Sequence, residues 1–259
     1  MAEVVIVGGA AEAGELVAAA IWRLVDARPR TVLGLATGSS PLPVYRALAR
    51  ECALHDLSRL RGFALDEYVG LAPEHPQSYA SVIRAEFVEP LGLDPAQASV
   101  PPTEPVDLRA AADTYEASIA AAGGVDLQLL GIGTDGHVGF NEPGSSLASR
   151  TRVKTLTEQT RRDNSRFFRS LDEVPLHCVT QGLGTIREAR HLVLLAFGAG
   201  KAAAVAAAVE GPVTASLPAS IIQLHPHATV VVDEDAASRL HRAAYYRHAF
   251  EHKPDWQEI

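Results

Sequence analysis

The stretch LLGIGTDGHVGFNEPG, residues 129–144, decides between two kinds of α/β fold. Gly131, Gly133 and Gly136 have the G-x-G-x-x-G spacing of dinucleotide-binding folds. That motif must open a helix, and an acidic residue must follow about 20 positions later to bind the ribose. Here glycine, asparagine and proline follow His137 too closely for a helix to form, and a basic, polar stretch stands where the acidic residue is needed. We therefore predict a loop after a strand, without a dinucleotide site.

On both sides of this loop, short runs of valine, leucine and isoleucine alternate with alanine-rich stretches. The predicted strands are VVIVGG, TVLGLA, GFALD, VDLQLLGI, HLVLLAFG and ATVVVDE, and the predicted helices cover residues 11–27, 41–54, 78–89, 107–122, 200–210 and 235–250. This order predicts a Rossmann-like α/β fold, with a mostly parallel central sheet and helices on both faces. Ligands of such folds bind at the carboxyl ends of the strands. Residues 1–259 are expected to form a single domain, because no composition break divides them.

Two segments depart from this alternation. Residues 89–107 are rich in proline and are expected to form an ordered surface connection. Residues 144–180 are the least regular part of the chain and contain the arginine-rich helix candidate EQTRRDNSRFFRSL. We expect this second segment to form a mobile cover.

Composition limits the classes of partner. The 259 residues carry a formal net charge of -8, which argues against a surface that binds nucleic acid or an anionic membrane. A small anion can still bind locally. The N-terminal run VVIVGGAA has neither the basic flank of a leader nor the length of a membrane span, and Cys52 and Cys178 provide no disulfide framework. A cytoplasmic location is expected.

Three protonatable groups lie on the glycine-rich loop within residues 129–144. Asp135, His137 and Glu142 follow a strand end, and a histidine between two carboxylates is suited to moving protons near neutral pH. The alternative is that Asp135 and Asn141 are ordinary turn residues and His137 is a loop histidine.

A second strand end carries the sequence TGSSP. Gly38, Ser39 and Ser40 leave backbone N–H groups bare, and Pro41 opens a helix whose positive end faces the turn. This arrangement indicates a phosphate site. It is not a P-loop, because the required spacing and lysine are absent. The alternative is that Ser39 or Ser40 only caps the helix.

Two further strand ends carry charge. Asp66 and Glu67 follow GFAL, where carboxylates can act as a general base, ligate or cap. Lys201 stands at the start of a helix, a position that is unfavourable for a cation unless an anion binds there. The pair His248 and His252 has a zinc-compatible spacing but lacks a third ligand, so we predict no metal site.

These segments together resemble the glucosamine-6-phosphate deaminase family. The stretches LDEYVGL, GTDGHVGFNEPGSSLASRTRVKTLT, NSRFF and SIIQLHPHATVVVDE look like its signature stretches, in the right order and over nearly the whole chain. The resemblance implies a sugar-phosphate isomerase type of fold. It also implies conversion of D-glucosamine 6-phosphate to D-fructose 6-phosphate and ammonia, without metal or redox cofactor, in amino-sugar catabolism.

The same resemblance implies residue roles. His137, flanked by Asp135 and Glu142, would open the sugar ring, and Asp66 would abstract the C2 proton. Gly38, Ser39, Ser40, Lys201 and Arg166 would hold the phosphate, with residues about 157–176 as a lid. The other arginines of that segment are expected to face solvent.

The resemblance also raises regulation and alternatives. Some family members are hexamers activated by N-acetylglucosamine 6-phosphate. Ser145, Arg152, Lys154 and Thr155 resemble residues of their effector site. The N-terminal stretch MAEVVIVGGA does not resemble the N-terminus of the activated enzymes, which contributes to that site. A homo-oligomer is expected. The alternative functions are a deaminase for another amino-sugar phosphate such as galactosamine 6-phosphate, a 6-phosphogluconolactonase-like hydrolase, and a sugar-phosphate sensor.

Overall fold

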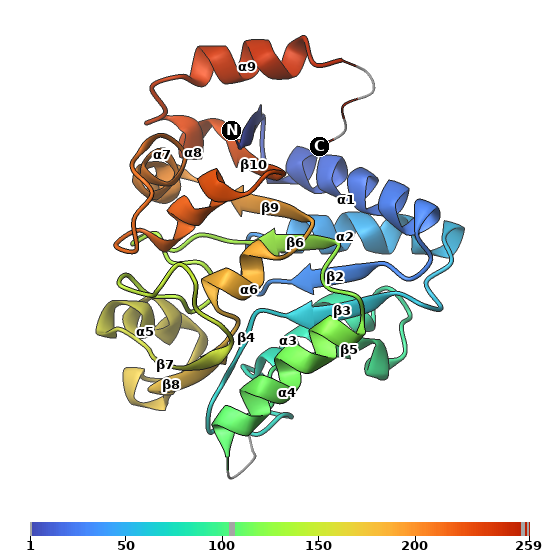
Figure 1. The fold of residues 1–259 in the computed structure, drawn as a ribbon, viewed down its shortest axis with the longest axis vertical. Helices are drawn as coiled ribbons and strands as arrows, with labels where there is room; N and C mark the ends of the chain where they lie inside the picture. The colour runs from blue at the N-terminus through green and yellow to red at the C-terminus, as the bar shows by residue number, and fades with distance from the viewer. Residues whose placement is uncertain (1, 104–106, 255–256, 258) are drawn as a thin grey trace.

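Seven short strands form one parallel sheet at the centre of the molecule (Figure 1). The structure is a computed structural model that describes residues 2–103, 107–254, 257 and 259. In spatial order the strands are β1 (Glu3–Val7), β10 (Ala228–Asp233), β9 (His191–Ala196), β6 (Leu127–Leu130), β2 (Val32–Leu35), β3 (Arg61–Ala64) and β5 (Ala98–Ser99). Every neighbouring pair is parallel. The predicted α/β fold is confirmed.

The strand order reverses between β2 and β6. From β2 the chain moves outward through β3 to β5, then returns to the other side of β2 and continues through β9 to β10. The loops that follow β2 and β6 therefore leave the sheet in opposite directions and open a crevice at its carboxyl edge. A ligand site is expected at this point.

Helices cover both faces of the sheet. The α-helices of the described residues are α1 (Ala10–Ala27), α2 (Leu42–Glu51), α3 (Tyr79–Ile83), α4 (Leu108–Ala121), α5 (Glu158–Asn164), α6 (Leu183–Arg187), α7 (Ala202–Glu210), α8 (Glu234–Ala237) and α9 (Ala243–Glu251). Of these, α5 lies away from the central sheet, next to its own 3-10 extension. Consecutive residues of β3 show the two faces. A Cβ on Gly62 would meet Leu35 and Phe87, and Phe87 packs on Tyr45 of α2. Phe63 instead packs on Tyr115 of α4.

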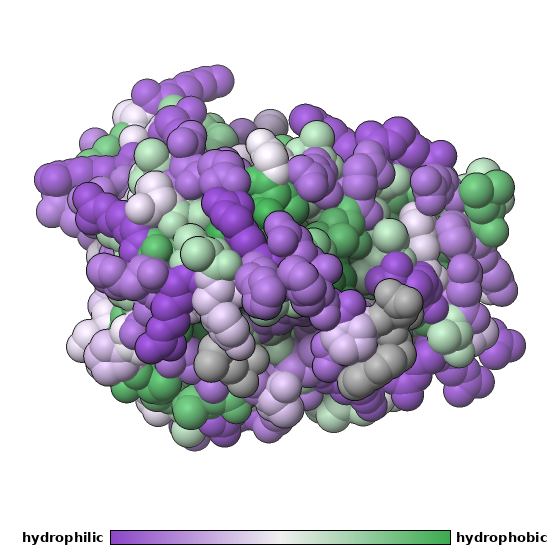
Figure 2. Space-filling view, turned by 90° about the horizontal axis from the view of Figure 1, so that it is seen from above, coloured by the Kyte–Doolittle hydropathy of each residue, from purple (hydrophilic) through white to green (hydrophobic). Residues whose placement is uncertain are grey.

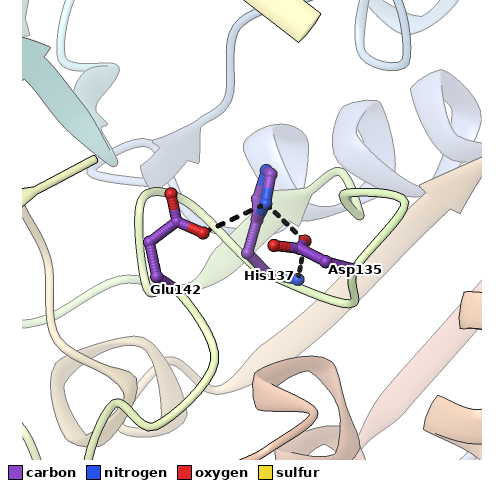
Figure 3. A group of neighbouring side chains, drawn as sticks. All are labelled: Asp135, His137 and Glu142. Carbon is purple, nitrogen blue, oxygen red and sulfur yellow. Dashed lines mark hydrogen bonds and ion pairs between the residues drawn. The ribbon is translucent and has the colours of Figure 1, made fainter. Parts of the chain in front are cut away.

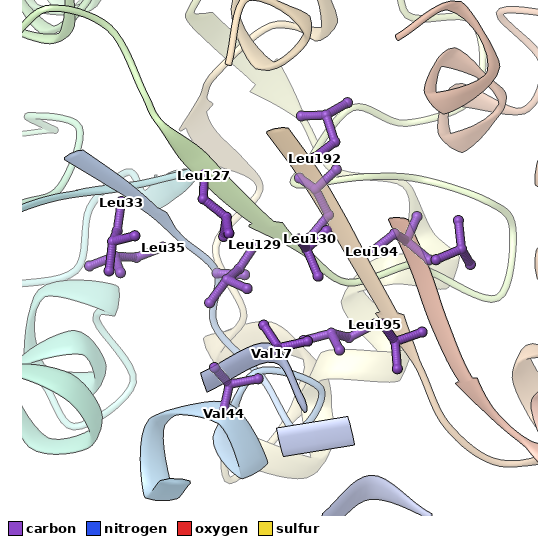
Figure 4. Close-up of a cluster of buried hydrophobic side chains, with 14 of the residues drawn as sticks. Val17, Leu33, Leu35, Val44, Leu127, Leu129, Leu130, Leu192, Leu194 and Leu195 are labelled. Carbon is purple, nitrogen blue, oxygen red and sulfur yellow. The ribbon is translucent and has the colours of Figure 1, made fainter. Parts of the chain in front are cut away.

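The core consists of aliphatic side chains from the central strands and from α1 and α2 (Figure 4). Leu33, Leu129 and Leu194 are each at most 1% exposed. Full burial of such a side chain contributes roughly 1.5–3 kcal/mol. Gly14 lets α1 approach α2, because a Cβ there would lie 2.5 Å from the carbonyl oxygen of Pro43.

One predicted helix is split. The pattern predicts a helix over 235–250, but α8 ends at Ala237 and α9 begins at Ala243. The backbone N–H groups of His241 and Arg242 donate to the Glu210 carboxylate, at 2.8 and 2.9 Å, and so leave the helical hydrogen-bond pattern. The predicted helix 78–89 likewise consists of α3 and a π-helical turn, Arg84–Val88.

A second, antiparallel sheet was not predicted. It contains β4 (Asp66–Tyr68), β8 (His177–Thr180) and β7 (Arg152–Thr155), in that order. The segment 144–180 is thus more regular than its sequence indicates. Its helix candidate EQTRRDNSRFFRSL is an α-helix only to Asn164. The Ser165 hydroxyl donates to the carbonyl oxygen of Arg162 at the end of α5, and Arg161 donates to the carbonyl oxygen of Leu171, where the chain has turned back. A 3-10 turn, Ser165–Phe167, follows α5, and another, Leu171–Glu173, precedes β8.

The face over α9 and α1 is mainly hydrophilic, with hydrophobic residues in separate patches (Figure 2). Within the part of the chain that the structure describes, no helix combines the length and hydropathy needed to cross a membrane. The described portion of the proline-rich connection contains β5 and a 3-10 turn, Pro95–Gln97, while its residues 104–106 lie outside the described residues.

Candidate functional site

The loop after β6 and the turn after β2 meet at the reversal of strand order. Every residue of 131–144 is described and none is helical, as the sequence predicts. A Cβ on Gly131 would lie 3.7 Å from Ser40 Oγ, so the β2 turn lies against the start of the β6 loop. Both predicted motifs therefore border the place where the reversal of strand order is expected to open a ligand crevice.

His137 lies between two carboxylates on the β6 loop (Figure 3). Its Nδ1 is 2.7 Å from Asp135 Oδ1 and 3.9 Å from Glu142 Oε2. Two glycines of the loop are required by local geometry. A Cβ on Gly133 would lie 2.3 Å from the imidazole ring of His137, and Gly136 adopts φ +83°. The glycines thus make room for the histidine and its turn.

The two carboxylates beside His137 have different surroundings. Partial burial opposes the charge of Asp135, but hydrogen bonding and the charge of His137 outweigh it and lower the pKa of Asp135 to about 2. Glu142 is 3% exposed, and its Oε1 accepts hydrogen bonds from the backbone N–H and the hydroxyl of Thr157. Its Oε2 has no hydrogen-bond partner among the residues that the structure describes. This buried oxygen is therefore the one side of the carboxylate to which no described residue donates.

Asp66 is the first residue of β4 and lies beside the same loop. A Cβ on Gly139 would be 3.2 Å from Asp66 Oδ2 and 3.1 Å from Thr180 Oγ1, and Gly139 has φ +56°. Burial, and secondarily the charge of Glu67, raises the pKa of Asp66 to about 8, against a hydrogen bond from the Phe140 backbone. Such a carboxyl group exchanges its proton close to neutral pH, as a general base requires.

Glu67, next in the chain, has a structural role. Its carboxylate accepts hydrogen bonds from the backbone N–H groups of Tyr68, Tyr79 and Ala80, at 2.8–2.9 Å. It therefore holds the start of α3 against β4. Burial raises the pKa of Glu67, and these hydrogen bonds partly offset that effect. Asp66 thus lies beside the loop of the candidate site, whereas the adjacent Glu67 stabilises the fold.

The predicted phosphate turn keeps its backbone accessible. Gly38 has φ +86° with open space where a Cβ would be, and Gly38 and Ser39 are exposed. No described side chain caps α2, whose N-cap residue is Pro41, so the alternative role of Ser39 or Ser40 as a cap is not observed. These N–H groups remain available to an anion.

The two cations predicted to bind phosphate lie within electrostatic reach of each other. Lys201, at the start of α7, donates from Nζ to the carbonyl oxygen of Ile132 at 2.7 Å. Burial lowers the pKa of Lys201, and the charge of Arg166 lowers it further, whereas Asp163 and Asp135 raise it. Arg166 is exposed and its guanidinium lies 4.7 Å from the Phe167 ring centroid. Two cations within electrostatic reach of each other favour an anion between them.

The predicted lid is tied to the site at two points. Thr157 caps α5 and donates to Glu142, and Asn164 at the other end of α5 donates to the hydroxyl of Tyr68 at 3.0 Å. Among the other arginines of this segment, Arg162 and Arg169 are exposed as expected, while Arg161 instead bonds the carbonyl oxygens of Leu171 and Val174.

The four residues predicted for an effector lie on or before β7. Ser145 is 3% exposed and its Oγ has no hydrogen-bond partner among the described residues. Arg152 donates to Asn141 Oδ1 at 2.9 Å, and Thr155 Oγ1 lies 3.2 Å from His177 Nδ1. Lys154 is partly buried on the same strand. Arg152 thus connects this strand to the residue that precedes Glu142.

The ligand atoms of Asp135, His137 and Glu142 lie within 4.8 Å of one another, close enough to hold a metal ion. The 2.7 Å contact between His137 Nδ1 and Asp135 Oδ1 has the length of a charge-assisted hydrogen bond. The contact is nevertheless an ion pair rather than a hydrogen bond, because Nδ1 has no hydrogen-bond partner among the described residues.

Sequence reasoning missed the residues that support this site. Thr180 Oγ1 accepts from the Phe140 backbone, and Asn141 donates to the carbonyl oxygens of Val138 and Gln181. The only local signal was the position of Asn141 inside the loop motif, and nothing in the sequence near Thr180 indicates its contact.

A parallel sheet with acidic, imidazole and cationic groups at its reversal of strand order is the architecture of an α/β enzyme of small-molecule metabolism. Residues 8–232 match the model of the family described as glucosamine-6-phosphate isomerases/6-phosphogluconolactonase. The chain belongs to this family.

Relatives within the family extend over the whole chain. A glucosamine-6-phosphate deaminase of Pseudarthrobacter chlorophenolicus is 61% identical over 99% of this chain and 100% of its own length. One of Streptomyces coelicolor is 60% identical with the same coverage. A solved structure described as a monomeric glucosamine-6-phosphate deaminase has a TM-score of 0.88 at 39% identity, covering 92% of this chain and 99% of the other. A 6-phosphogluconolactonase from Leishmania guyanensis, at 21% identity and a TM-score of 0.74 over 92% of this chain and 98% of the other, shares the fold.

Proposed function

We propose that this protein is a glucosamine-6-phosphate deaminase that converts D-glucosamine 6-phosphate and water to D-fructose 6-phosphate and ammonia. Relatives of this name are about 60% identical over full length, whereas the lactonases are distant. The observation that carries the proposal is the buried Asp66 carboxyl group, with its pKa raised to about 8, beside the loop of His137. Hydrolysis of a lactone needs a base that activates water. Isomerisation instead needs a carboxylate placed to take a proton from C2.

In the first step, the pyranose ring opens. A proton must leave the O1 hydroxyl while another reaches the ring oxygen, and His137 can perform both transfers. Asp135 fixes the orientation of the imidazole through the 2.7 Å contact and stabilises its charged form. Glu142 presents Oε2, which accepts no hydrogen bond from a described residue, 3.9 Å from His137 Nδ1.

In the second step, the open-chain sugar isomerises. The Asp66 carboxylate takes the proton from C2, His137 gives a proton to the C1 carbonyl oxygen, and an enolamine forms. A proton is then returned to C1, which leaves an imine at C2. Water adds to this imine, and ammonia leaves as the C2 ketone forms. A positioned carboxylate contributes roughly 10²- to 10⁴-fold to such a step.

The phosphate anchors the far end of the substrate. We assign it to the backbone N–H groups of Gly38, Ser39 and Ser40 and to the side chains of Lys201 and Arg166. Support comes from the uncapped N-terminus of α2 and from the electrostatic contact between the two cations. Binding energy at this end orients C1 and C2 over Asp66.

We also propose that residues 157–176 act as a lid. The segment supplies Arg166 to the phosphate and Thr157 to Glu142, so closure would assemble both ends of the site together. Limited proteolysis with and without a phosphorylated sugar tests this assignment. Protection within 157–176 is expected on binding, and equal cleavage would contradict it.

The remaining proposals concern the setting of the enzyme. We propose that residues 1–259 form one domain and that the enzyme acts in the cytoplasm, in N-acetylglucosamine breakdown, without a metal or redox cofactor. We also propose N-acetylglucosamine 6-phosphate as an effector that binds at Ser145, Arg152, Lys154 and Thr155. A homo-oligomer is supported by the exposed apolar side chains of Val153 and Leu176, at 39% and 55% exposure, although one related structure is described as monomeric. Light scattering of the purified protein tests the assembly, with a hexamer as one expected form.

The decisive experiment measures ammonia and fructose 6-phosphate released from glucosamine 6-phosphate, with EDTA present and with Asp66→Asn as the paired variant. Equal release of both products by the wild type, lost in the variant, is expected. Galactosamine 6-phosphate and 6-phosphogluconolactone are run in parallel. Faster turnover of either would replace the proposed substrate, and loss of activity in EDTA would contradict a metal-free mechanism.

A further inference from the structure

A basic pocket lies at the amino edge of the sheet, opposite to the crevice described above. Its lining includes Arg28, Arg30, Arg59, Asp126 and Arg190, and its volume is about 460 Å³. These residues stand just before β2, β3, β6 and β9. The pocket thus spans the amino ends of the same four strands whose carboxyl ends lead into the candidate active site.

Two of the arginines are held in place by a buried carboxylate. Asp126 is 7% exposed and accepts hydrogen bonds from Arg28 Nη1 at 2.7 Å, Arg190 Nη1 at 3.0 Å and the Val32 backbone at 2.8 Å. Arg190 Nη2 also donates to the carbonyl oxygen of Gly123. Both guanidinium groups stay about half exposed, so each keeps donors for a ligand in a fixed orientation.

The other two arginines have no such partner. Arg30 and Arg59 are exposed, and neither side chain forms a hydrogen bond or ion pair with another described residue in the pocket. The pKa of Asp56 is lowered, mainly by hydrogen bonds from Ser58 and in part by the charge of Arg59. The negative end of the α1 dipole accounts for a cation at Arg28, but scaffold contacts do not account for Arg30 and Arg59.

The charge of the lining is unbalanced. Four guanidinium groups share one carboxylate, in a chain whose formal net charge is -8. A planar guanidinium matches two oxygens of a phosphate, and several of them in one cavity favour a ligand with more than one phosphate group. We propose that this pocket binds a small molecule that carries two linked phosphate groups.

The test titrates pyrophosphate into the full-length protein by calorimetry, at about 0.15 M salt so that nonspecific attraction is screened. The variant Arg30→Ala with Arg59→Ala keeps the Asp126 contacts and removes two ligand donors. We expect its affinity to fall by about tenfold or more, because charge-assisted hydrogen bonds are lost. Deaminase activity and thermal stability should remain at wild-type values in this variant.

Two matched controls locate the binding. Arg84→Ala with Arg239→Ala removes the same charge from exposed positions outside the pocket and should bind as the wild type does. Lys201→Gln weakens the proposed active-site phosphate contact and should also leave this binding event intact. If the Arg84/Arg239 pair weakens binding equally, or if only Lys201→Gln removes it, the proposal is wrong.

Two other probes define the ligand class. Orthophosphate offers a single phosphate group and should bind at least about tenfold more weakly than pyrophosphate. ATP carries linked phosphates and should compete with pyrophosphate for the pocket. Orthophosphate binding as tight as that of pyrophosphate, or no heat from pyrophosphate at all, would overturn the assignment.

Discussion

The carboxylate of Asp66 packs against the backbone of Gly139, so closely that a Cβ at Gly139 would lie 3.2 Å from Oδ2. The contact joins the first residue of β4 to the loop after β6, and thereby sets the Asp66 carboxylate beside the loop of His137. It also requires glycine for a second reason, because φ at this position is +56°.

We therefore expect Gly139→Ala to lower kcat/KM by about tenfold or more, because the added methyl group displaces the Asp66 carboxylate. Gly92→Ala is the matched control. Gly92 also has a positive φ, +65°, but open space where its Cβ would be, so it bears the backbone strain without the contact. Steady-state kinetics on both variants decide the point, and equal activity losses would mean that strain alone acts.

The raised pKa of Asp66 predicts the pH dependence of catalysis. Only the charged carboxylate accepts a proton from C2, so kcat/KM should rise with pH and level off above about 8. Rates from about pH 6 to about pH 9.5 in a buffer of constant ionic strength measure this. A profile that is flat over the whole range would show that Asp66 is not the titrating base.

The free energy of unfolding should also depend on the ionisation of Asp66. It should fall as the pH rises, whereas kcat/KM should rise. The folded protein keeps the Asp66 proton up to about pH 8, whereas an unfolded chain releases it near the ordinary value of 3.8. Raising the pH through this window therefore costs the folded state free energy. Asp66→Asn avoids the charge, so its melting temperature should exceed that of the wild type by a margin that grows from about pH 5 to about pH 9. A constant margin would contradict the burial effect.

Glu67→Gln should instead destabilise the protein by about 1–3 kcal/mol. An amide places an NH₂ group against at least one of the three backbone N–H groups that now donate to the carboxylate. Denaturant unfolding measures the effect, and Glu89→Gln, at an exposed glutamate, provides the control. Unchanged stability would assign Glu67 to the crevice rather than to the scaffold.

Lys201→Gln should raise KM for the phosphorylated substrate by about tenfold or more, because a charge-assisted contact to phosphate is lost. Any turnover of unphosphorylated glucosamine should keep the same kcat/KM, since this sugar presents no phosphate. Arg84→Gln removes one charge elsewhere and should change neither value. Equal losses on both sugars would place Lys201 at the reacting carbons.

Six of the seven parallel strands could be predicted because buried parallel strands are continuous apolar runs. The edge strand β5 is only two residues long, Ala98–Ser99, and carries no pattern. The second sheet could not be predicted from the sequence, for a different reason. Its strands pair over long distances, as Asp66 does with Thr180, and β7 exposes alternate residues such as Val153.

The site was predictable where it follows a strand end. Asp66, His137 and Lys201 each come shortly after an apolar run, and the strand-end rule places them at one edge. Thr157 and Thr180 could not be found in this way, because their roles depend on contacts with Glu142 and Phe140 that no sequence pattern records. Glu210 divides α8 from α9 by the same kind of distant contact.

Because the strand order reverses at the candidate site, the site is complete only when both halves of the sheet have folded. Its two sides depend on one central pairing, in which Leu33 lies beside Leu127, with a long stretch of chain between them. With the proposed site residues, a partly folded chain that has formed either half alone lacks one of the two sides needed to bind a phosphorylated sugar. A ligand that needs both halves binds only after this non-local pairing closes, so mass action draws the refolding population toward the complete sheet.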